Sequence, residues 1–411
     1  MPQASRDGLA ATSLRPEPAR SRLATFLLGA SLVLVALNLR TPITSVGPVL
    51  PEIVQSQHLS ALGASILTTL PALCFGFAGA GAPILARGLG TEQAVLAALL
   101  ALALGTGLRG IASVPAVFLG QILACCAIGV VNVLLPGIVK HDFPRRVALM
   151  TGLYTMALTA GAAAAAGATV PLVHALGGSW ATALAFWAAP AALAAALWTP
   201  RLRGQAEGGG RTVLRVRGLW TDALAWQVTL FMGFQAALAY IVFGWLAPML
   251  RDRGLSAVDA GLILSLSVVV QAAAALVAPV LATRGRDQRL WNAGAVALCL
   301  VGLLGCFWAP LSTVWIWALL LGVAQGSLFA LALTLLVLRA ADAHVAAHLS
   351  SMAQGVGYVL TAAGPLLAGL LHGWTGGWNA VAVLCIAIGL GAALSGFGAG
   401  RSAHVRAAHH R

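Results

Sequence analysis

The stretch LATFLLGASLVLVALNLRTPITSVGP, residues 23–48, decides the class of fold. Its first part, Leu23–Leu37, is an unbroken apolar run without a charged residue, and the apolar pattern resumes after Asn38, Arg40 and Pro42. A helix that spans a lipid bilayer needs about 20 predominantly apolar residues. The stretch is therefore predicted to be a membrane-spanning helix that carries an arginine and a proline within its length.

The composition extends this prediction to the whole chain. Of its 411 residues, 60% are hydrophobic and 9% are charged, and the mean hydropathy is +0.91. A soluble domain carries about 25% charged residues, so a soluble fold of this length would lack the polar groups to cover its surface. The strands of a membrane barrel alternate polar and apolar residues in segments of about 10, whereas the apolar runs here are continuous. We predict an all-α membrane protein.

Twelve stretches have the length and hydropathy of a spanning helix. Several are longer than a straight crossing needs, which tilting accommodates. Prolines within them are compatible with membrane helices, because neighbouring helices satisfy the freed backbone groups. We predict spans at residues 23–54, 59–86, 91–108, 114–139, 146–175, 179–199, 224–250, 257–282, 289–308, 312–338, 346–372 and 376–398.

A basic, glycine-rich linker at residues 200–223 divides these spans into two sets of six. We predict an N-terminal half at 23–199 and a C-terminal half at 224–398, with short cytoplasmic tails at 1–22 and 399–411. Two six-helix halves of like topology are typical of the major facilitator fold.

Short matches that lie 196 to 198 residues apart indicate that the two halves are duplicates. The pairs are Leu59–Ala61 with Leu255–Ala257, Gly47 with Gly244, and His174 and Trp180 with His372 and Trp378. Equivalent positions in the two halves are therefore expected to lie at equal depth in the membrane.

The net charge of +13 reflects membrane topology rather than binding to nucleic acid. The basic residues cluster in short segments between the apolar runs, and such clusters mark the cytoplasmic side of a membrane protein. With both termini in the cytoplasm, only Arg109, Arg251 and Arg253 of the 24 lysines and arginines fall on the outer side. Arg40 alone is assigned to neither side. The chain is predicted to lie in the inner membrane of a bacterium.

Arg40 is predicted to lie near the middle of the membrane. The repeat places it at the level of Ala237, within the span at 224–250. An arginine at that depth costs about 2.5–3.5 kcal/mol on insertion scales. The nearest acid along the chain, Glu52, is about 18 Å away along a helix, and the other acids fall in loops or at the ends of spans.

Four kinds of partner remain for Arg40: water in a cavity, backbone carbonyls, neutral polar side chains, or a bound anion. Most of these imply that it faces a central polar cavity. Pro42 cannot donate a hydrogen bond to the carbonyl of Asn38, so the helix is expected to loosen there. The alternative is a structural arginine that clamps carbonyl groups between the halves.

Other polar residues within the spans are candidates for the same cavity. Thr44 lies on the same helical stripe as Arg40, and a break at Pro42 would bring Asn38 towards that stripe. Neutral amides in membranes also join helices to each other, which is the alternative for several of them. The predicted substrate-binding residues are Arg40, Asn38, Thr44, Asn132, Tyr154, Gln235, Gln325, Gln354 and Tyr358.

Several classes of function are disfavoured. All six cysteines fall in apolar segments, so a disulfide framework is not expected. There is no phosphate-binding GxxxxGK[ST] loop, no HExxH segment and no cluster of carboxylates within the spans. We therefore predict neither ATP-driven transport nor an enzyme, and neither a cofactor nor a metal. No buried carboxylate stands out as a proton-coupling group.

Four segments in combination resemble the CynX/NimT branch of the major facilitator superfamily, the family of cyanate transporters and 2-nitroimidazole exporters. They are ALNLRTPITSVGPVLPEI, NVLLPGIVKHDFPRRVALMTGLYTMAL, WQVTLFMGFQAALAYIVFGWLAPML and LSSMAQGVGYVLTAAGPLLAGLLHGWTGGW. The resemblance runs from about residue 23 to residue 398 and covers both halves. It implies a twelve-helix transporter that works by alternating access on a small solute.

Two substrate classes stay open at this point. An anion such as cyanate would pair with the Arg40 guanidinium, and it alone would neutralise the charge. A neutral nitroimidazole would need aromatic stacking, for example from Tyr154, Tyr358 or Trp245. The sequence favours the anion, with export of small drugs as the alternative. We expect a monomer in the lipid bilayer whose partner is the solute.

Overall fold

The computed structural model describes residues 22–144, 146–204, 215–406 and 408–410. The first span is broken into three helices: α1 (Arg22–Asn38), α2 (Thr41–Thr44) and α3 (Val46–Gln57). The axis bends by 41° between α2 and α3. The loosening expected at Pro42 is therefore present as a break in the helix.

The remaining elements follow in chain order. They are α4 (Ala61–Leu89), α5 (Thr91–Leu108), α6 (Val114–Asp142), α7 (Val147–Ala175), α8 (Trp180–Phe186), α9 (Ala188–Trp198), η1 (Thr199–Gly204), β1 (Arg215–Arg217), η2 (Leu219–Thr221), α10 (Ala223–Asp252), α11 (Ala257–Ala282), α12 (Arg289–Trp308), η3 (Leu311–Thr313), α13 (Val314–Leu338), α14 (Ala343–Thr375), α15 (Asn379–Ala399) and β2 (Ala408–His410).

The prediction of an all-α membrane protein with twelve spans is confirmed. Eleven stretches of helix in the described residues are long and apolar enough to cross a membrane, and the bent first segment makes up to twelve. Helices α8 and α9 together form the sixth span, Trp180–Leu202. Outside the helices, the short strands β1 and β2 pair antiparallel.

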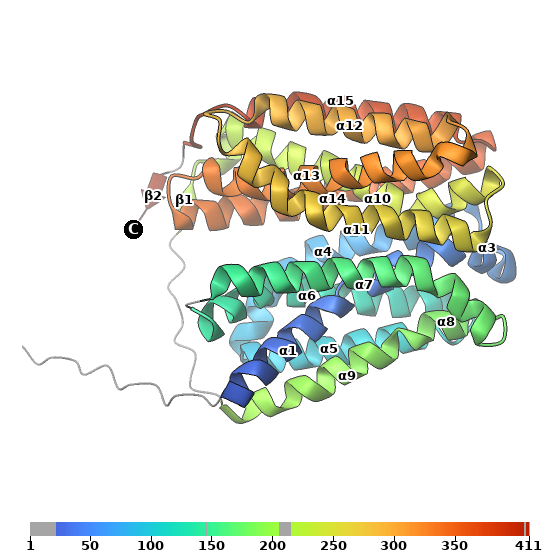
Figure 1. The fold of residues 1–411 in the computed structure, drawn as a ribbon. Helices are drawn as coiled ribbons and strands as arrows, with labels where there is room; N and C mark the ends of the chain where they lie inside the picture. The colour runs from blue at the N-terminus through green and yellow to red at the C-terminus, as the bar shows by residue number, and fades with distance from the viewer. Residues whose placement is uncertain (1–21, 145, 205–214, 407, 411) are drawn as a thin grey trace, which may run out of the picture.

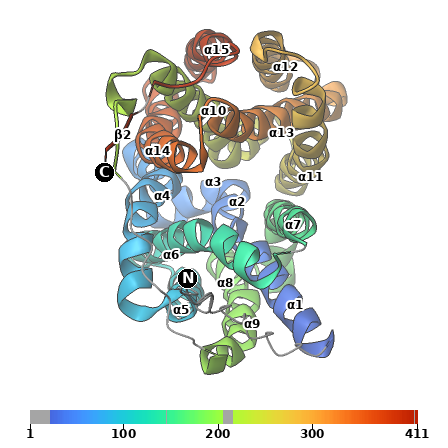
Figure 2. The same cartoon turned by 90° about the vertical axis from the view of Figure 1, so that its left-hand side faces the viewer.

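The helices form two bundles that pack side by side (Figure 1). Helices α10–α15 group together, and α1 and α5–α9 lie on the other side, as the view in Figure 2 shows. Helix α4 packs against α14, and α7 packs against α11, across the boundary between the halves. The start of α1, the paired strands and the end of the chain lie at one end of the bundles, which we call the linker end. The opposite end is called the distal end.

The duplication inferred from the sequence recurs in the packing of the helices. A Cβ atom added at Gly105 would lie 2.7 Å from the backbone nitrogen of Ala124, so α5 and α6 approach too closely for any side chain there. A Cβ atom added at Gly302 would lie 2.7 Å from the backbone nitrogen of Leu321, which gives α12 and α13 the same approach. Gly105 and Gly302 are 197 residues apart, and so are their contact residues Ala124 and Leu321.

Polar contacts join the halves in their distal part. Arg251 at the end of α10 forms an ion pair of 2.8 Å with Glu52 on α3 and also donates to the carbonyl of Pro48. The Ser265 hydroxyl on α11 donates to the carbonyl of Ala163 on α7 at 2.8 Å. These polar contacts join the two bundles near their distal ends.

Candidate functional site

Arg40 lies at the break in the first span, between α1 and α2, with its side chain partly buried at the boundary between the halves. Its guanidinium carbon is 5.7 Å from the ring centre of Phe243 on α10 and 5.5 Å from that of Phe329 on α13. Both distances are those of cation–π contacts. Within the described residues no acidic side chain pairs with Arg40, so its charge is held by aromatic rings and remains unneutralised.

The two rings that contact Arg40 belong to an aromatic cluster, which we define as Phe75, Tyr240, Phe243, Phe329 and Tyr358. Phe75 contacts Tyr240 and Tyr358 edge to face, with ring centres 6.4 and 5.8 Å apart. Tyr240 contacts Phe243 in the same way at 5.9 Å. The five rings come from α4, α10, α13 and α14, so both halves contribute.

The two tyrosines of the cluster have free phenol groups. Neither the Tyr240 nor the Tyr358 hydroxyl has a hydrogen-bond partner among the described residues, and neither is a fully enclosed polar atom. A phenol normally finds a partner when it is buried. Both hydroxyls therefore keep unused hydrogen-bonding capacity for water or for a ligand.

A small cavity adjoins the cluster between the halves. It is lined by α2, α3 and α4 on one side and by α10 on the other, with Gln121 of α6 as its polar wall. Its volume of about 10 Å³ has room for about one water molecule. The distal side of the Arg40 region is therefore nearly closed in this arrangement of the helices. The lining residues are Ile43, Val46, Leu67, Thr68, Pro71, Gln121, Tyr240, Phe243 and Gly244.

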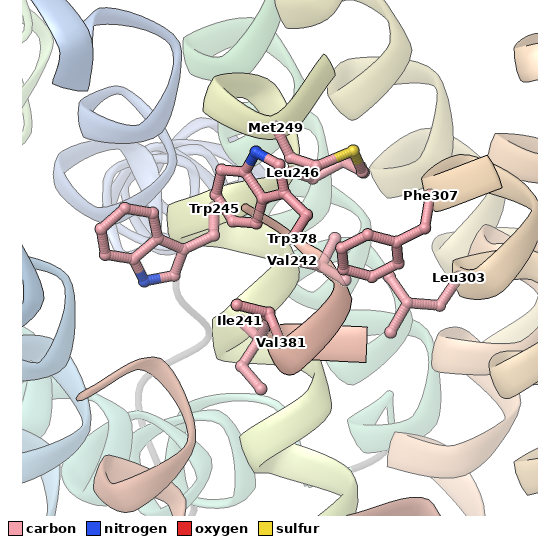
Figure 3. A pocket seen from close by; sticks show the side chains of 9 residues that line it. All are labelled: Ile241, Val242, Trp245, Leu246, Met249, Leu303, Phe307, Trp378 and Val381. Carbon is pink, nitrogen blue, oxygen red and sulfur yellow. The ribbon is translucent and has the colours of Figure 1, made fainter. Parts of the chain in front are cut away.

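A second small cavity lies wholly within the C-terminal half (Figure 3). Its lining is almost entirely apolar and contributes no charge or free hydroxyl. Trp245, Phe307 and Trp378 form one wall of tilted rings, with ring centres 6.0 and 6.4 Å apart between neighbours. We assign it to packing between α10, α12 and α15.

Asn38 and Thr44 hold the broken helix in place. Asn38 is fully buried, and its amide nitrogen donates to the carbonyls of Leu34 at 2.8 Å and Pro190 at 3.2 Å. The Thr44 hydroxyl is fully buried and donates to the carbonyl of Ala162 on α7 at 2.8 Å. The structure thus turns both side chains towards neighbouring helices of their own half, on either side of Arg40.

The three glutamines differ in their surroundings. Gln235 is buried and donates to the carbonyl and sulfur of Met232 on its own helix. Gln325 accepts from Gln271 at 3.1 Å, and its own amide nitrogen, one turn from Phe329, is buried with no partner in the described part of the chain. Gln354 donates to Ser350 at 2.8 Å and lies one turn from Tyr358.

Asn132 and Tyr154 are half-buried residues of the N-terminal half. Asn132 shares a face of α6 with Gln121 and Cys125, which point towards the broken span. Tyr154 on α7 packs against the buried apolar cluster that also contains Phe75 and Tyr240. The structure brings Arg40 and Tyr358 of the predicted residues together, and among the described residues no ring contact or hydrogen bond joins Asn132 or Tyr154 to the aromatic cluster.

Sequence reasoning missed Arg109 and the aromatic residues Phe75, Phe243 and Phe329. Arg109 was predicted to lie on the outer side, but its side chain is fully buried between helices. Burial without a carboxylate lowers the pKa of this guanidinium, which still stays protonated at neutral pH. The repeat offers a signal for the burial of Arg109. The equivalent position in the C-terminal half is Cys306, an apolar residue of the predicted span 289–308, and it too is fully buried.

The chain is similar to known transport proteins. The profile of the Major Facilitator Superfamily matches residues 28–362 and, in a second match, residues 228–407. The 2-nitroimidazole transporter of Escherichia coli is 38% identical over 92% of this chain and 97% of its own length. The cyanate transport protein CynX of Escherichia coli is 31% identical over 84% of this chain and 90% of its own.

Solved structures agree on the fold. The xylose transporter XylE of Escherichia coli, in an inward open conformation, superposes with a TM-score of 0.72. The match covers 93% of this chain and 97% of that one, at 13% sequence identity. At this identity the likeness concerns the arrangement of the helices alone.

Proposed function

Because the chain belongs to the Major Facilitator Superfamily and its relatives in that family are transporters and not enzymes, we propose that the small solute it transports is an anion. The solute would bind between the two halves, next to Arg40, and would be exposed to the two sides of the membrane in turn. Cyanate is the leading candidate.

The observation that carries this proposal is the unneutralised charge of Arg40 at the boundary of the halves. A cation–π contact stabilises a cation without cancelling its charge. A bound anion would form a charge-assisted hydrogen bond with the guanidinium, which is stronger than a bond between neutral groups. The relatives that transport cyanate and 2-nitroimidazole are consistent with a small, planar solute.

In this proposal the predicted polar residues fall into three groups: contacts to the solute, residues along its path, and supports of the helices. Arg40 and Tyr358 contact the solute, together with the Tyr240 hydroxyl. Asn132, Tyr154, Gln325 and Gln354 line the path to it. Asn38, Thr44 and Gln235 support the helices that carry the contact residues, since their side chains are already bonded to neighbouring groups.

The aromatic cluster also favours a second candidate, a neutral nitro-heterocycle. Five rings and two free phenol hydroxyls offer stacking surfaces and donors to nitro oxygens. The two candidates are separated by a thermal-shift titration of the purified protein with cyanate, nitrate, benzoate and 2-nitroimidazole. A ligand that binds only the folded protein raises its melting temperature. Stabilisation by cyanate supports the anion; stabilisation by 2-nitroimidazole alone overturns it.

We further propose that the linker end faces the cytoplasm of a bacterium, with the protein as a monomer in the inner membrane. The basic residues that flank the spans at the linker end support this orientation, because cytoplasmic loops carry an excess of lysine and arginine. The distal contacts then make the present arrangement one that is closed to the outside.

The ion pair between Glu52 and Arg251 should act as a distal latch. Its side chains are 35% and 23% exposed, and a pair of this exposure contributes about 0.2–1 kcal/mol. We expect Glu52→Gln to increase the labelling of a Val46→Cys probe by an impermeant maleimide from the distal side about two- to fivefold. Val46 lines the nearly closed cavity between the halves.

The matched control for this latch is the exchange of both charges. The double variant Glu52→Arg with Arg251→Glu should restore slow labelling, because the attraction is retained with its direction reversed. Raised salt should speed the labelling of Val46→Cys in the protein that keeps the Glu52–Arg251 pair, and it should leave the labelling rate of the Glu52→Gln variant unchanged. If the exchanged pair labels as fast as Glu52→Gln, the ion pair does not hold the distal side closed.

A further inference from the structure

Arg109 occupies an unusual position for a residue in a short turn between spans. It follows α5 directly, and its side chain is fully buried. Its bonded neighbours are neutral, and its Nε atom is buried without a partner among the residues that the structure describes. An arginine that serves only topology would extend to water, as a basic residue near the end of a helix usually does.

The acceptors of Arg109 come from three other elements. Its Nη1 atom donates to the carbonyl of Pro42 at 3.0 Å and to the Gln121 side-chain oxygen at 3.1 Å, and Nη2 donates to the carbonyl of Leu184 at 3.5 Å. These groups lie on α2, α6 and α8. Arg109 does not cap its own helix with these bonds; it connects the broken first span to two others.

The packing leaves room for this side chain. A Cβ atom added at Gly120 would lie 3.0 Å from the Cγ atom of Arg109, so glycine at this position leaves space for the arginine stem. Gln121, the next residue on α6, donates from its amide nitrogen to the carbonyl of Pro42 at 3.4 Å while its oxygen accepts from Arg109. Two side chains therefore converge on one carbonyl.

That carbonyl lies two residues beyond Arg40, at the break in the first span. A free carbonyl at a broken helix is where the backbone is least constrained, since the bonds of a continuous helix are interrupted. Asn38, before the break, donates to the carbonyl of Pro190, and Thr44, which follows Pro42 in α2, donates to the carbonyl of Ala162. Arg109 and Gln121 supply the remaining anchor.

We propose that Arg109 is a positioning residue for Arg40: by holding the Pro42 carbonyl it fixes the broken backbone so that the Arg40 guanidinium lies between Phe243 and Phe329. The inference rests on the proposed function insofar as Arg40 is taken to bind the solute. It assigns a role to a residue that contacts neither the aromatic cluster nor the solute.

The first test measures cyanate transport in proteoliposomes for Arg109→Lys. Lysine keeps the charge but loses the planar fork that reaches several acceptors at once. We expect KM for cyanate to rise about tenfold with kcat within about twofold, because the binding geometry is disturbed and the conformational cycle is not. In an Arg40→Ala background, Arg109→Lys should cause no further loss of cyanate binding.

Arg253→Lys is the matched control. Arg253 is another arginine at the distal end whose guanidinium donates only to carbonyls, those of Cys306 and Ala309, within the C-terminal half. Its replacement should leave KM unchanged. An equal rise of KM in both variants, or an undiminished effect of Arg109→Lys in the Arg40→Ala background, would show that Arg109 does not act through Arg40.

The second test needs no substrate. An Arg40→Cys variant is labelled with an anionic methanethiosulfonate, with the parent protein as the measure of background from its own cysteines. If Arg109 orients position 40, adding Arg109→Lys or Gln121→Leu should change the labelling rate by about fivefold or more, while Arg253→Lys should not. Melting temperatures verify that each variant is folded. If Arg109→Lys does not fold, the Gln121→Leu variant alone carries the labelling test.

The outcomes separate the two proposals. Unchanged labelling in both folded variants overturns the role of Arg109, whatever cyanate does. A changed labelling rate with no effect of Arg40→Ala on transport supports the positioning of residue 40 and overturns the anion site instead.

Discussion

Replacing Arg40 by alanine is expected to lower cyanate affinity at least about 100-fold, while the protein stays folded in the membrane. Hydrogen bonds to charged groups contribute about 1.5–3 kcal/mol each, and a guanidinium can form two of them with one anion. The folded state loses only two cation–π contacts and is relieved of a partly buried charge. Uptake of labelled cyanate by proteoliposomes, with a melting curve for each sample, measures both effects.

Arg40→Lys is the informative companion to this variant. Lysine keeps a positive charge between the two rings but offers a point charge in place of a planar fork. The affinity of the Arg40→Lys variant for cyanate is expected to lie between those of the parent and of Arg40→Ala. If Arg40→Ala transports cyanate as well as the parent, the anion site is wrong. If Arg40→Ala instead stops the protein from folding, Arg40 is a structural clamp.

Gly47→Val is expected to abolish the distal closure of the transporter. A Cβ atom at Gly47 would lie 2.4 Å from the carbonyl oxygen of Phe243 in the opposite half, closer than real Cβ contacts allow. Overpacking such a contact costs about 1–3 kcal/mol, which shifts an equilibrium between two states about 5- to 150-fold. The protein should accumulate with its distal side open and lose most of its transport.

Labelling of the Val46→Cys probe from the distal side measures this shift, in parallel with cyanate uptake. Gly355→Ala is the matched control, because a Cβ atom there meets no atom within 4 Å and the residue also lies in a spanning helix. It should label and transport like the parent. Normal uptake by Gly47→Val would show that the close approach of α3 to α10 is not needed in the cycle.

The positions of the spans were predictable because hydropathy and length are local properties of the chain. The predicted spans at 91–108, 257–282 and 289–308 coincide with α5, α11 and α12. The largest difference in length is at α14, which extends three residues beyond each end of the predicted span 346–372, and the difference in kind is in the first span, where α1 to α3 are interrupted. Pro42 predicted that interruption, since a residue without an N–H leaves a gap in the hydrogen bonds of any helix.

The candidate site was predictable only in part. Arg40 stood out because a charge deep in an apolar span requires a compensating environment. The orientation of a polar side chain about its helix is a different matter: Asn38 and Thr44 share the span of Arg40 yet bond to α9 and α7. An ideal helix could not reveal this, because the break rotates the residues on its two sides relative to each other.

The sequence by itself determined that this chain is a membrane protein of two six-helix halves, and it predicted one arginine within the bilayer, because the cost of placing each residue in lipid depends on that residue and its neighbours along the chain. Only the tertiary structure decided what surrounds that arginine. The rings of Phe243 and Phe329 lie more than 200 residues away along the chain, and Arg109 reaches Pro42 from a different helix. Such contacts depend on how the helices rotate and pack, which is settled by the whole fold rather than by any single segment.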